Sequence, residues 1–330
     1  MPRRPLSIVP ALLVCAGLTL AGTGAAQPLS GVAIVSSEKD DALALIDTAR
    51  LTVIGTLATC KRPRHMRLSV DGKALLVACG DSGQADRISL ATRQSLGRIT
   101  LGDDPEIFDL SPDGKLLYVS NEEDGELGII DLATGKRLGA VAVGEEPEGV
   151  IVAPDGKRIY VTSEVASMVH AVSAATRKVE KNIAVGKRPR RFAFNADGSE
   201  LWVSNELGAS VSVIDTRTLA VTKTLPFEVK GMRADDISPV DLKLSRDGKT
   251  MYVALGRANH VAFVDTAGKT VRALVLAGKR AWGLGLNRDG SRLFVANGLS
   301  DDVTVIDTAG AKALKTVPAG RVPHSVVVID

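Results

Sequence analysis

Short runs of alternating apolar and polar residues follow one another along nearly the whole chain, separated by turn residues. Between Leu110 and Gly149 the chain reads LSPDGKLLYVSNEEDGELGIIDLATGKRLGAVAVGEEPEG. The alternation and the content of Val, Ile and Tyr are typical of strands that bury one face. Pro112 stands at the second position of a type I turn that Gly114 closes. The stretch therefore predicts a meander of four short antiparallel strands.

The same unit recurs at a nearly constant interval. Asp-Gly turns stand at Asp71, Asp113, Asp155, Asp197, Asp247 and Asp289, in steps of 42, 42, 42, 50 and 42 residues. Four strands in about 42 residues is the period of a β-propeller blade. The one long step indicates an insertion, which we assign to residues 226–239 (PFEVKGMRADDISP) between the fifth and sixth blades.

The two ends of the chain each lack part of a blade. The last strand, HSVVVID, ends at Asp330 with no turn after it, whereas GVAIVSS, ALALID and TVIGTLA have no first strand before them. Joined, they complete a seventh blade and remove exposed sheet edges. The predicted fold is all-β: a seven-bladed β-propeller of four-stranded antiparallel blades, closed by N- and C-terminal strands that share one blade.

Residues 1–26 have the composition of a secretory signal peptide. Arginines precede an apolar run from Ile8 to Leu20, and small residues follow it. The run is too short to span a bilayer. We expect cleavage before Gln27, a periplasmic location and a single mature domain over residues 27–330. The alternative is a lipoprotein anchored at Cys15, although a valine before that cysteine fits a lipobox poorly.

Composition narrows the range of partners. The formal net charge of +3 falls to about +1 once the two arginines of the leader are removed. Such a balance favours neither nucleic acid nor an anionic membrane as partner. With 45% hydrophobic residues and no second long apolar run, we expect a soluble monomer without a membrane span.

Two cysteines, Cys60 and Cys79, remain in the mature chain. In repeat register they stand before a first strand and at the end of a second strand, on one rim of one blade. In an oxidising compartment this placement favours a disulfide, and the alternative is two partly buried thiols. The sequence has no CxxCH motif for covalent haem and no Cys or His spacing typical of a metal site.

The turns distinguish the two rims of the disc. Turns after first and third strands are nearly uniform (SPDG, APDG, NADG, DTAG), so we call this side the uniform rim. Connections between blades vary strongly, reading CKRPRH, GDDPEI, GEEPEG, GKRPRR, GKRAWG and GRVPHS, and these define the variable rim. Variable loops on a rigid scaffold are where binding residues concentrate.

The candidate binding site is the mouth of the central channel on the variable rim. The residue after each proline position opens an inner strand there, and the exits of second strands and the insertion add further polar groups. The predicted site residues are Arg62, Arg64, His65, Glu106, Glu122, Glu148, Glu164, Arg188, Arg190, Glu206, Asp235, Asp236, Trp282, Asn297 and His324. Convergent polar groups with an aromatic side chain are typical of ligand sites. The competing interpretation is solvated surface charge.

Two expectations follow for this mouth. If the mouth is the binding site, replacing both Arg64 and Arg190 by Ala should abolish binding of the ligand or partner and leave the melting temperature nearly unchanged. The insertion over residues 226–239 lies beside the mouth, where a long loop often acts as a lid or wall. The alternative is a tolerated surface excursion.

The tracts YVSN, YVTS, WVSN and FVAN with PDG turns resemble the YVTN-type β-propeller repeats of bacterial surface and periplasmic proteins. The tracts CKRPR, DDPEIF, ADDISPV, ALGRANHVAFVD and NGLSDDVTVID together resemble more closely the periplasmic propeller associated with pyrroloquinoline quinone (PQQ)-dependent alcohol catabolism. The resemblance covers nearly all of residues 31–330. It implies a partner protein of periplasmic alcohol oxidation, without a defined catalytic activity. The chain departs from that pattern at VPHS and ANH, both at the rim.

Three function classes follow from these observations. The preferred one is a non-catalytic binding or scaffold propeller that binds a small ligand or a periplasmic partner of a PQQ-linked system, with no cofactor of its own expected. The second is a propeller hydrolase such as a metal-dependent lactonase. Its hard cation would take oxygen ligands from Glu38, Glu122, Glu164, Glu206, Asn205 and Asn297. The third is a relative of haem-d1-binding propellers, with His65 and His324 as axial ligands. The fold by itself does not decide between them.

Overall fold

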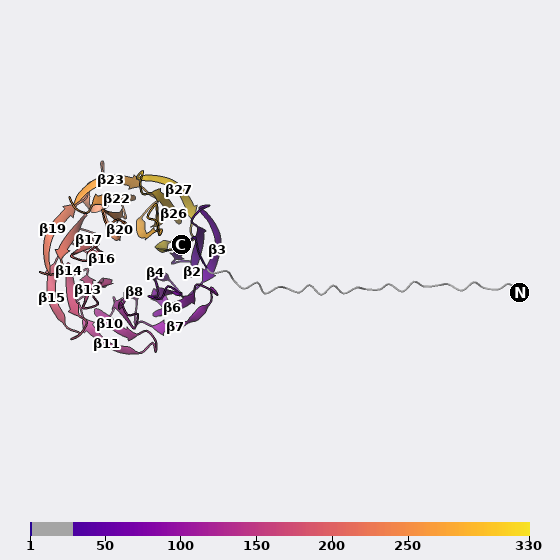
Figure 1. Cartoon of the computed structure of the whole chain (residues 1–330), viewed down its shortest axis with the longest axis horizontal. Coiled ribbons are helices and arrows are strands. Elements are labelled where there is room, and N and C mark those ends of the chain that lie inside the picture. Colours follow the sequence, from indigo (N-terminus) through magenta and orange to yellow (C-terminus); the bar gives the residue numbers. More distant parts are fainter. Residues whose placement is uncertain (2–28) are drawn as a thin grey trace.

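The computed structural model describes residues 1 and 29–330 and places them in seven four-stranded antiparallel sheets. The sheets stand around one axis as the blades of a closed ring (Figure 1). The predicted all-β seven-bladed propeller is therefore confirmed. The signal peptide over residues 1–26, its cleavage site and Cys15 are predictions that lie outside the described residues, apart from residue 1.

Each blade runs from an inner strand to an outer strand. The inner strands are β4 (Pro63–Leu68), β8 (Pro105–Leu110), β12 (Pro147–Val152), β16 (Pro189–Phe194), β20 (Pro239–Leu244), β24 (Ala281–Leu286) and β28 (Pro323–Ile329). The second strands are β1 (Val32–Ser37), β5 (Ala74–Cys79), β9 (Leu116–Asn121), β13 (Arg158–Ser163), β17 (Glu200–Asn205), β21 (Thr250–Leu255) and β25 (Arg292–Asn297).

The outer half of each blade has the same order. The third strands are β2 (Ala42–Asp47), β6 (Gln84–Ser89), β10 (Glu126–Asp131), β14 (Met168–Ser173), β18 (Ser210–Asp215), β22 (His260–Asp265) and β26 (Asp302–Asp307). The outer strands are β3 (Thr52–Ala58), β7 (Ser95–Thr100), β11 (Arg137–Ala142), β15 (Val179–Ala184), β19 (Ala220–Pro226), β23 (Thr270–Leu276) and β27 (Lys312–Pro318). Two short 3-10 turns, η1 (Gly80–Ser82) and η2 (Ala234–Asp236), lie on connections.

The ring closes as the repeat count predicts. β28 pairs antiparallel with β1, with Val327 opposite Ile34, in the sheet order β28-β1-β2-β3. It also packs against β24 and β4 on either side, so the C-terminal strand lies inside the ring (Figure 1). The shared blade leaves no open edge between the first and last parts of the described chain.

The uniform rim is built from repeated turn chemistry. In the turn after β8, Asp113 Oδ1 accepts the backbone N–H of Lys115 at 3.1 Å and the hydroxyl of Ser111 at 2.6 Å. Gly114 has φ +70°, a left-handed conformation that glycine adopts without a steric cost. Similar Asp side-chain bonds recur at Asp71, Asp155, Asp197, Asp247 and Asp289. This rim therefore positions the strands.

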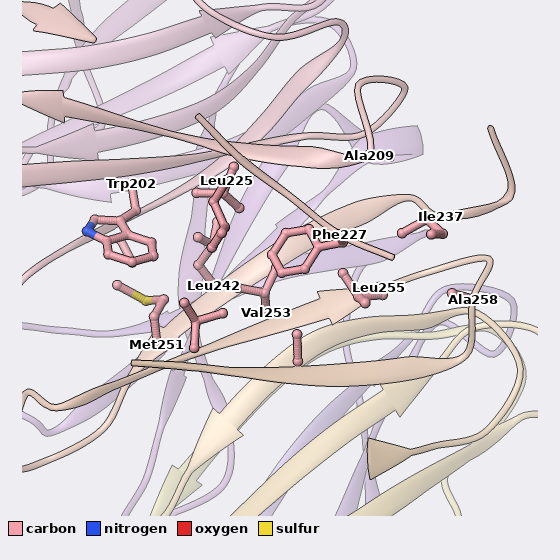
Figure 2. Close-up of a cluster of buried hydrophobic side chains, with 14 of the residues drawn as sticks. Trp202, Ala209, Leu225, Phe227, Ile237, Leu242, Met251, Val253, Leu255 and Ala258 are labelled. Atoms are coloured by element: carbon pink, nitrogen blue, oxygen red, sulfur yellow. The ribbon is translucent and has the colours of Figure 1, made fainter. Parts of the chain in front are cut away.

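The insertion is anchored in the core between two blades. Phe227 and Ile237, near its two ends, are 3% and 2% exposed and pack in one cluster with Trp202, Leu242 and Met251. Figure 2 shows this cluster, with Phe227 between Leu225 and Leu255. The middle of the insertion, including η2, is largely exposed. The insertion is thus anchored in the core near both ends, and its central turn faces solvent.

Cys60 and Cys79 are joined by a disulfide, with their Cα atoms 5.8 Å apart. The bond connects the loop before β4 to the end of β5 within one blade. Among residues 29–330 no helix is long and apolar enough to cross a membrane.

Candidate functional site

A β-bulge at the start of each inner strand sets the geometry of the channel mouth. In β16 the regular pairing with β17 stops at Pro189 and resumes at Phe192, so Arg190 and Arg191 stand outside the ladder. Bulges re-aim side chains beside functional sites. The same shift occurs in β4, β8, β12, β20 and β24, and where β1 meets β28.

Hydroxyl groups of second strands hold these bulges and connect neighbouring blades. Ser204 Oγ accepts the N–H of Arg191 at 3.0 Å and donates to the carbonyl of Val240 in the next blade at 2.5 Å. Ser36, Ser120 and Thr162 make equivalent pairs of bonds. Three of these four residues are the Ser or Thr of the YVSN, YVTS and WVSN tracts. Those tracts therefore support the mouth.

Arg190 lies at the centre of a buried ion-pair cluster. Its Nη1 is 2.6 Å from Glu164 Oε1 and 3.3 Å from Glu206 Oε2, and its Nη2 is 3.2 Å from Glu148 Oε1. The neighbouring cations Arg188 and Arg191 contact the same carboxylates. We call these six residues the Arg190 cluster: Glu148, Glu164, Arg188, Arg190, Arg191 and Glu206.

A second cluster surrounds Arg64. This guanidinium group pairs with Glu106 and has its Nε 3.7 Å from Glu38 Oε1. Arg62 adds contacts to Asp104 at 3.2 Å and to Glu106 at 3.5 Å. The basic and acidic residues predicted for the mouth thus pair with each other, so these arginines already contact carboxylates of the protein itself.

The expectation that Arg64 and Arg190 are removable surface charges is wrong. Their side chains are 11% and 8% exposed, and each compensates carboxylates that are themselves buried. Removing one partner of a buried ion pair leaves an uncompensated charge, which destabilises the fold. The interpretation of the mouth as solvated charge does not fit these residues either.

Burial and neighbouring charges shift the pKa values of two glutamates in the Arg190 cluster in opposite directions. Burial alone would raise the pKa of Glu148, but the guanidinium groups of Arg190, Arg191 and Arg64 outweigh it and lower this pKa to about 2. For Glu164 burial prevails over Arg190, and the negative charges of Glu148 and Glu206 reinforce it, raising the pKa to about 8. One carboxylate thus stays ionised, while its neighbour holds a proton at neutral pH.

A cavity of about 220 Å³ opens beside the two clusters. Its polar lining consists of Glu38, Arg62, Arg64, Arg280, Trp282 and His324. The guanidinium carbon of Arg280 lies 4.2 Å from the ring centroid of Trp282, a cation–π distance. A second cavity of about 530 Å³ shares Arg280 and Trp282. We call the smaller one the mouth cavity.

His324 brings a neutral imidazole to the mouth cavity. Its pKa is lowered well below the ordinary value by burial and by the positive charges of Arg64 and Arg191. Nε2 lies 3.4 Å from Arg191 Nη2 and 3.8 Å from Glu38 Oε1. Because Nε2 accepts from Arg191, the ring proton is on Nδ1. Within residues 29–330, neither His324 Nδ1 nor Trp282 Nε1 has a hydrogen-bond partner. Both are thus buried N–H donors without a partner in this part of the chain.

The remaining predicted site residues lie apart from the mouth cavity. Asp235 and Asp236 are in η2, where Arg233 Nε contacts Asp236 Oδ2 at 3.3 Å. Asn297 donates to Asp302 at 2.6 Å and so serves its own blade. His65 lies deeper in the channel, edge-on to Phe108 with ring centroids 5.0 Å apart.

Glu122 lies near the Arg64 cluster and is half-buried. Burial and the charge of Glu148 raise its pKa. Its carboxylate, with those of Asp104 and Glu106, forms a group whose oxygens lie within 4.8 Å of one another. The guanidinium groups of Arg62 and Arg64 contact Asp104 and Glu106 in this group. They compensate its negative charge without a metal ion.

The oxygen ligands expected for a hard cation do not come together. Glu164 and Glu206 converge on Arg190, Glu38 contacts Arg64, and the amides of Asn205 and Asn297 bond to hydroxyl groups of their own blades. A cation would compete with guanidinium groups at each carboxylate. The set of oxygen ligands predicted for a metal-dependent lactonase is therefore wrong.

The pair expected to ligate haem does not fit that role either. His324 Nε2 faces Arg191 and Glu38, so its lone pair is already directed at a guanidinium group. His65 packs edge-on against Phe108 inside the channel. The residues present do not offer two imidazole nitrogens to a macrocycle.

Sequence reasoning missed Arg191 and Arg280. Arg191 follows Arg190, which the prediction included. The bulge takes both residues out of the regular strand pairing. Arg280 stands in GKRAWG, the one inter-blade connection with Arg-Ala where the others have a proline. The missing proline was the feature of the sequence that could have drawn attention to Arg280.

Comparison with known proteins locates the fold among characterised propellers. Residues 171–329 match the family model "Lactonase, 7-bladed beta-propeller". The match spans just under half of the chain, from β14 to β28. No curated protein matches the chain.

Solved structures share the architecture at low sequence identity. The periplasmic gluconolactonase PpgL of Pseudomonas aeruginosa has a TM-score of 0.76 at 21% identity, over 89% of this chain and 98% of that chain. A putative 6-phosphogluconolactonase from Bacteroides fragilis has a TM-score of 0.73 at 20% identity, over 89% and 96%. The dihydro-heme d1 dehydrogenase NirN, in complex with DHE, has a TM-score of 0.67 at 16% identity, over 91% and 75%. These likenesses show the fold alone.

Proposed function

We propose that the mouth cavity is the active site of a hydrolase that opens a small polar lactone. The observation that carries the proposal is the position of Glu38, whose Oε1 lies 3.7 Å from Arg64 Nε and 3.8 Å from His324 Nε2 at the wall of this cavity. A carboxylate base thus lines the same cavity as guanidinium groups. The lactonase family match over residues 171–329 and the fold of PpgL support the same class.

The chemistry needs a base and a stabiliser of negative charge. Glu38 takes a proton from water, whose oxygen attacks the lactone carbonyl carbon. The carbonyl oxygen becomes negative, and Arg280 stabilises it with its guanidinium group. The ring C–O bond then breaks, and the leaving alkoxide takes the proton from Glu38. One water is consumed, and the product is an open-chain hydroxy acid.

The mouth cavity also limits the substrate. Its volume of about 220 Å³ suits a single small ring and excludes a polymer. Trp282 supplies a flat apolar wall, over which Arg280 is stacked. The charged groups of Glu38, Arg62 and Arg280 in the lining of the cavity fit the hydroxyl or ring oxygens of a sugar lactone. An aldonolactone is therefore the substrate class that we propose.

The test is the hydrolysis of glucono-1,5-lactone and of its 6-phosphate, followed by base uptake and corrected for the spontaneous reaction. We expect Glu38→Gln to reduce kcat by about 100-fold or more, because general base catalysis typically contributes that much. Arg280→Met should lower kcat/KM as well. Glu123→Gln changes an exposed carboxylate on the same rim and is the matched control. Full activity in Glu38→Gln would exclude this mechanism.

The second candidate is the non-catalytic binding propeller of a PQQ-linked alcohol oxidation system. The observation that favours it is the concentration of arginines that already hold carboxylates at the mouth, since a quinone with several carboxylates offers the same groups. Titration with PQQ tests it by quenching of Trp fluorescence. Binding that Arg62→Met weakens, without turnover of any lactone, would favour this candidate over the hydrolase. Both candidates include our proposal that residues 1–26 direct the protein to the periplasm.

A further inference from the structure

Below the mouth, the inner strands enclose a second cavity of about 790 Å³. Residues from β4, β8, β12, β16, β20, β24 and β28 all line it, so it is the central channel itself. Gly149 and Gly285 are among the lining residues, which leaves room between the larger side chains. It opens toward the uniform rim, where Ser69 and Val70 complete its lining.

Positive charge predominates in this channel. Arg67, Arg191 and Lys243 line it from three different blades, and Arg246 adds a fourth cation. The charges of Arg67, Arg191 and Lys243 all act on His65, whose pKa is lowered well below its ordinary value, chiefly by burial and then by these cations. The three cations therefore face a common space.

The carboxylates at the channel already accept hydrogen bonds from backbone N–H groups. Asp109 Oδ2 accepts the N–H of Val152 at 2.9 Å, and Asp241 Oδ2 accepts the N–H of Leu284 at 2.8 Å. Each bond crosses from one blade to the next. Arg67 pairs with Asp109 at 2.5 Å. These acids serve blade packing. Arg191 pairs with Glu148 outside the channel, so the channel cations that form no ion pair with any of residues 29–330 are Lys243 and Arg246.

Lys243 has no ion pair and no hydrogen bond from its ammonium group within the described residues. Its pKa is lowered, first by burial between the channel walls and then by repulsion from Arg67 and Arg246, against which Asp241 acts. The Lys243 side chain is exposed, so its ammonium group is reachable from the channel. An anion bound beside Lys243 would relieve the repulsion from the two neighbouring cations.

We infer that the channel is a second ligand site, which holds a small multivalent oxyanion between Lys243 and Arg67. A phosphate or a di- or tricarboxylate has the required charge and several acceptor oxygens. The site is separate from the mouth cavity, because Arg67, Lys243 and Arg246 line only the channel. Its occupant enters from the uniform rim, past Val70.

The test uses inorganic phosphate and citrate as probes, with the mature chain and calorimetry at constant ionic strength. We expect Lys243→Met to weaken the binding of the preferred probe by about tenfold or more, since one charge-assisted contact is lost. The same substitution should leave the melting temperature of the unliganded protein nearly unchanged, because the side chain is exposed. Lys249→Met, at an exposed position on the uniform rim, is the matched control and should not change the binding.

Two results would overturn the inference. One is the absence of saturable binding of either probe to the wild-type protein beyond the effect of chloride. The other is binding that Lys243→Met leaves intact and Arg62→Met removes, which would place the anion in the mouth cavity. Activity toward lactones is measured separately, so its loss or presence does not affect this result.

Discussion

Arg190 Nη1 lies 2.6 Å from Glu164 Oε1, although the two residues belong to neighbouring blades. The contact joins the start of β16 to the loop after β13, and it places an acid with a raised pKa beside a permanent cation. Blade-to-blade attachment at the mouth therefore depends on buried charge as well as on apolar packing. The consequences differ for the two partners.

Glu164→Gln should change the pH dependence of stability. The folded-state pKa of about 8 lies above the ordinary 4.5, so the stability that this group contributes is present below pH 4.5 and is lost as pH rises through about 8. Gln keeps the neutral form. Between pH 5 and pH 9, the variant should therefore gain at least about 1.4 kcal/mol on the wild type, the equivalent of one pKa unit.

The measurement is chemical denaturation at pH 5, 7 and 9. Glu145→Gln is the matched control, because Glu145 is exposed on the adjacent connection. A stability difference between wild type and Glu164→Gln that stays constant over this range would show that Glu164 is ionised throughout.

Arg190→Ala should destabilise the protein strongly. The change leaves Glu148, which is buried and ionised, without its principal cation, and breaking such a pair costs about 3–5 kcal/mol. Thermal unfolding checks this directly, with Lys187→Ala on the same connection as the exposed control. An unchanged melting temperature would show that the charges of the mouth are solvated surface charges.

Phe227→Ala tests the anchoring of the insertion. Phe227 is 3% exposed and packs among Leu225, Leu242 and Leu255, so its truncation should cost about 3–5 kcal/mol. Lys230→Ala, in the exposed part of the insertion, should be nearly neutral. Equal melting temperatures for the two variants would indicate a loose surface excursion.

Deleting residues 323–330 tests the closure of the ring. The deletion removes β28 and its packing against β24 and β4 and exposes the edge of β1, so soluble folded protein should be lost or should aggregate. Removing Asp330 alone, which follows β28, is the control. A truncated protein that melts within about 2 °C of the full chain would contradict the shared blade, because the loss of a whole inner strand should cost several kcal/mol, each worth roughly 1.6 °C in a domain of about 300 residues.

The repeat in the sequence determined the architecture. Strand alternation and Asp-Gly turns are local properties, and their constant spacing in residues 71–289 predicted both the blade and its neighbours. The incomplete ends at residues 31 and 330 predicted the closure. In each case the necessary interactions lie between residues adjacent in the chain or in register with a copy of the same unit.

Only the tertiary structure decided what the mouth is. The sequence placed Arg190, Glu148 and Glu164 on one rim, but whether they face solvent, a ligand or each other depends on the bulge in β16 and on the angle between blades. The same holds for Lys243, which reads as an ordinary polar position along its strand. Charge pairing and desolvation depend on distances of a few ångströms between separate blades. A sequence pattern determines the register along a strand, but it does not determine those distances.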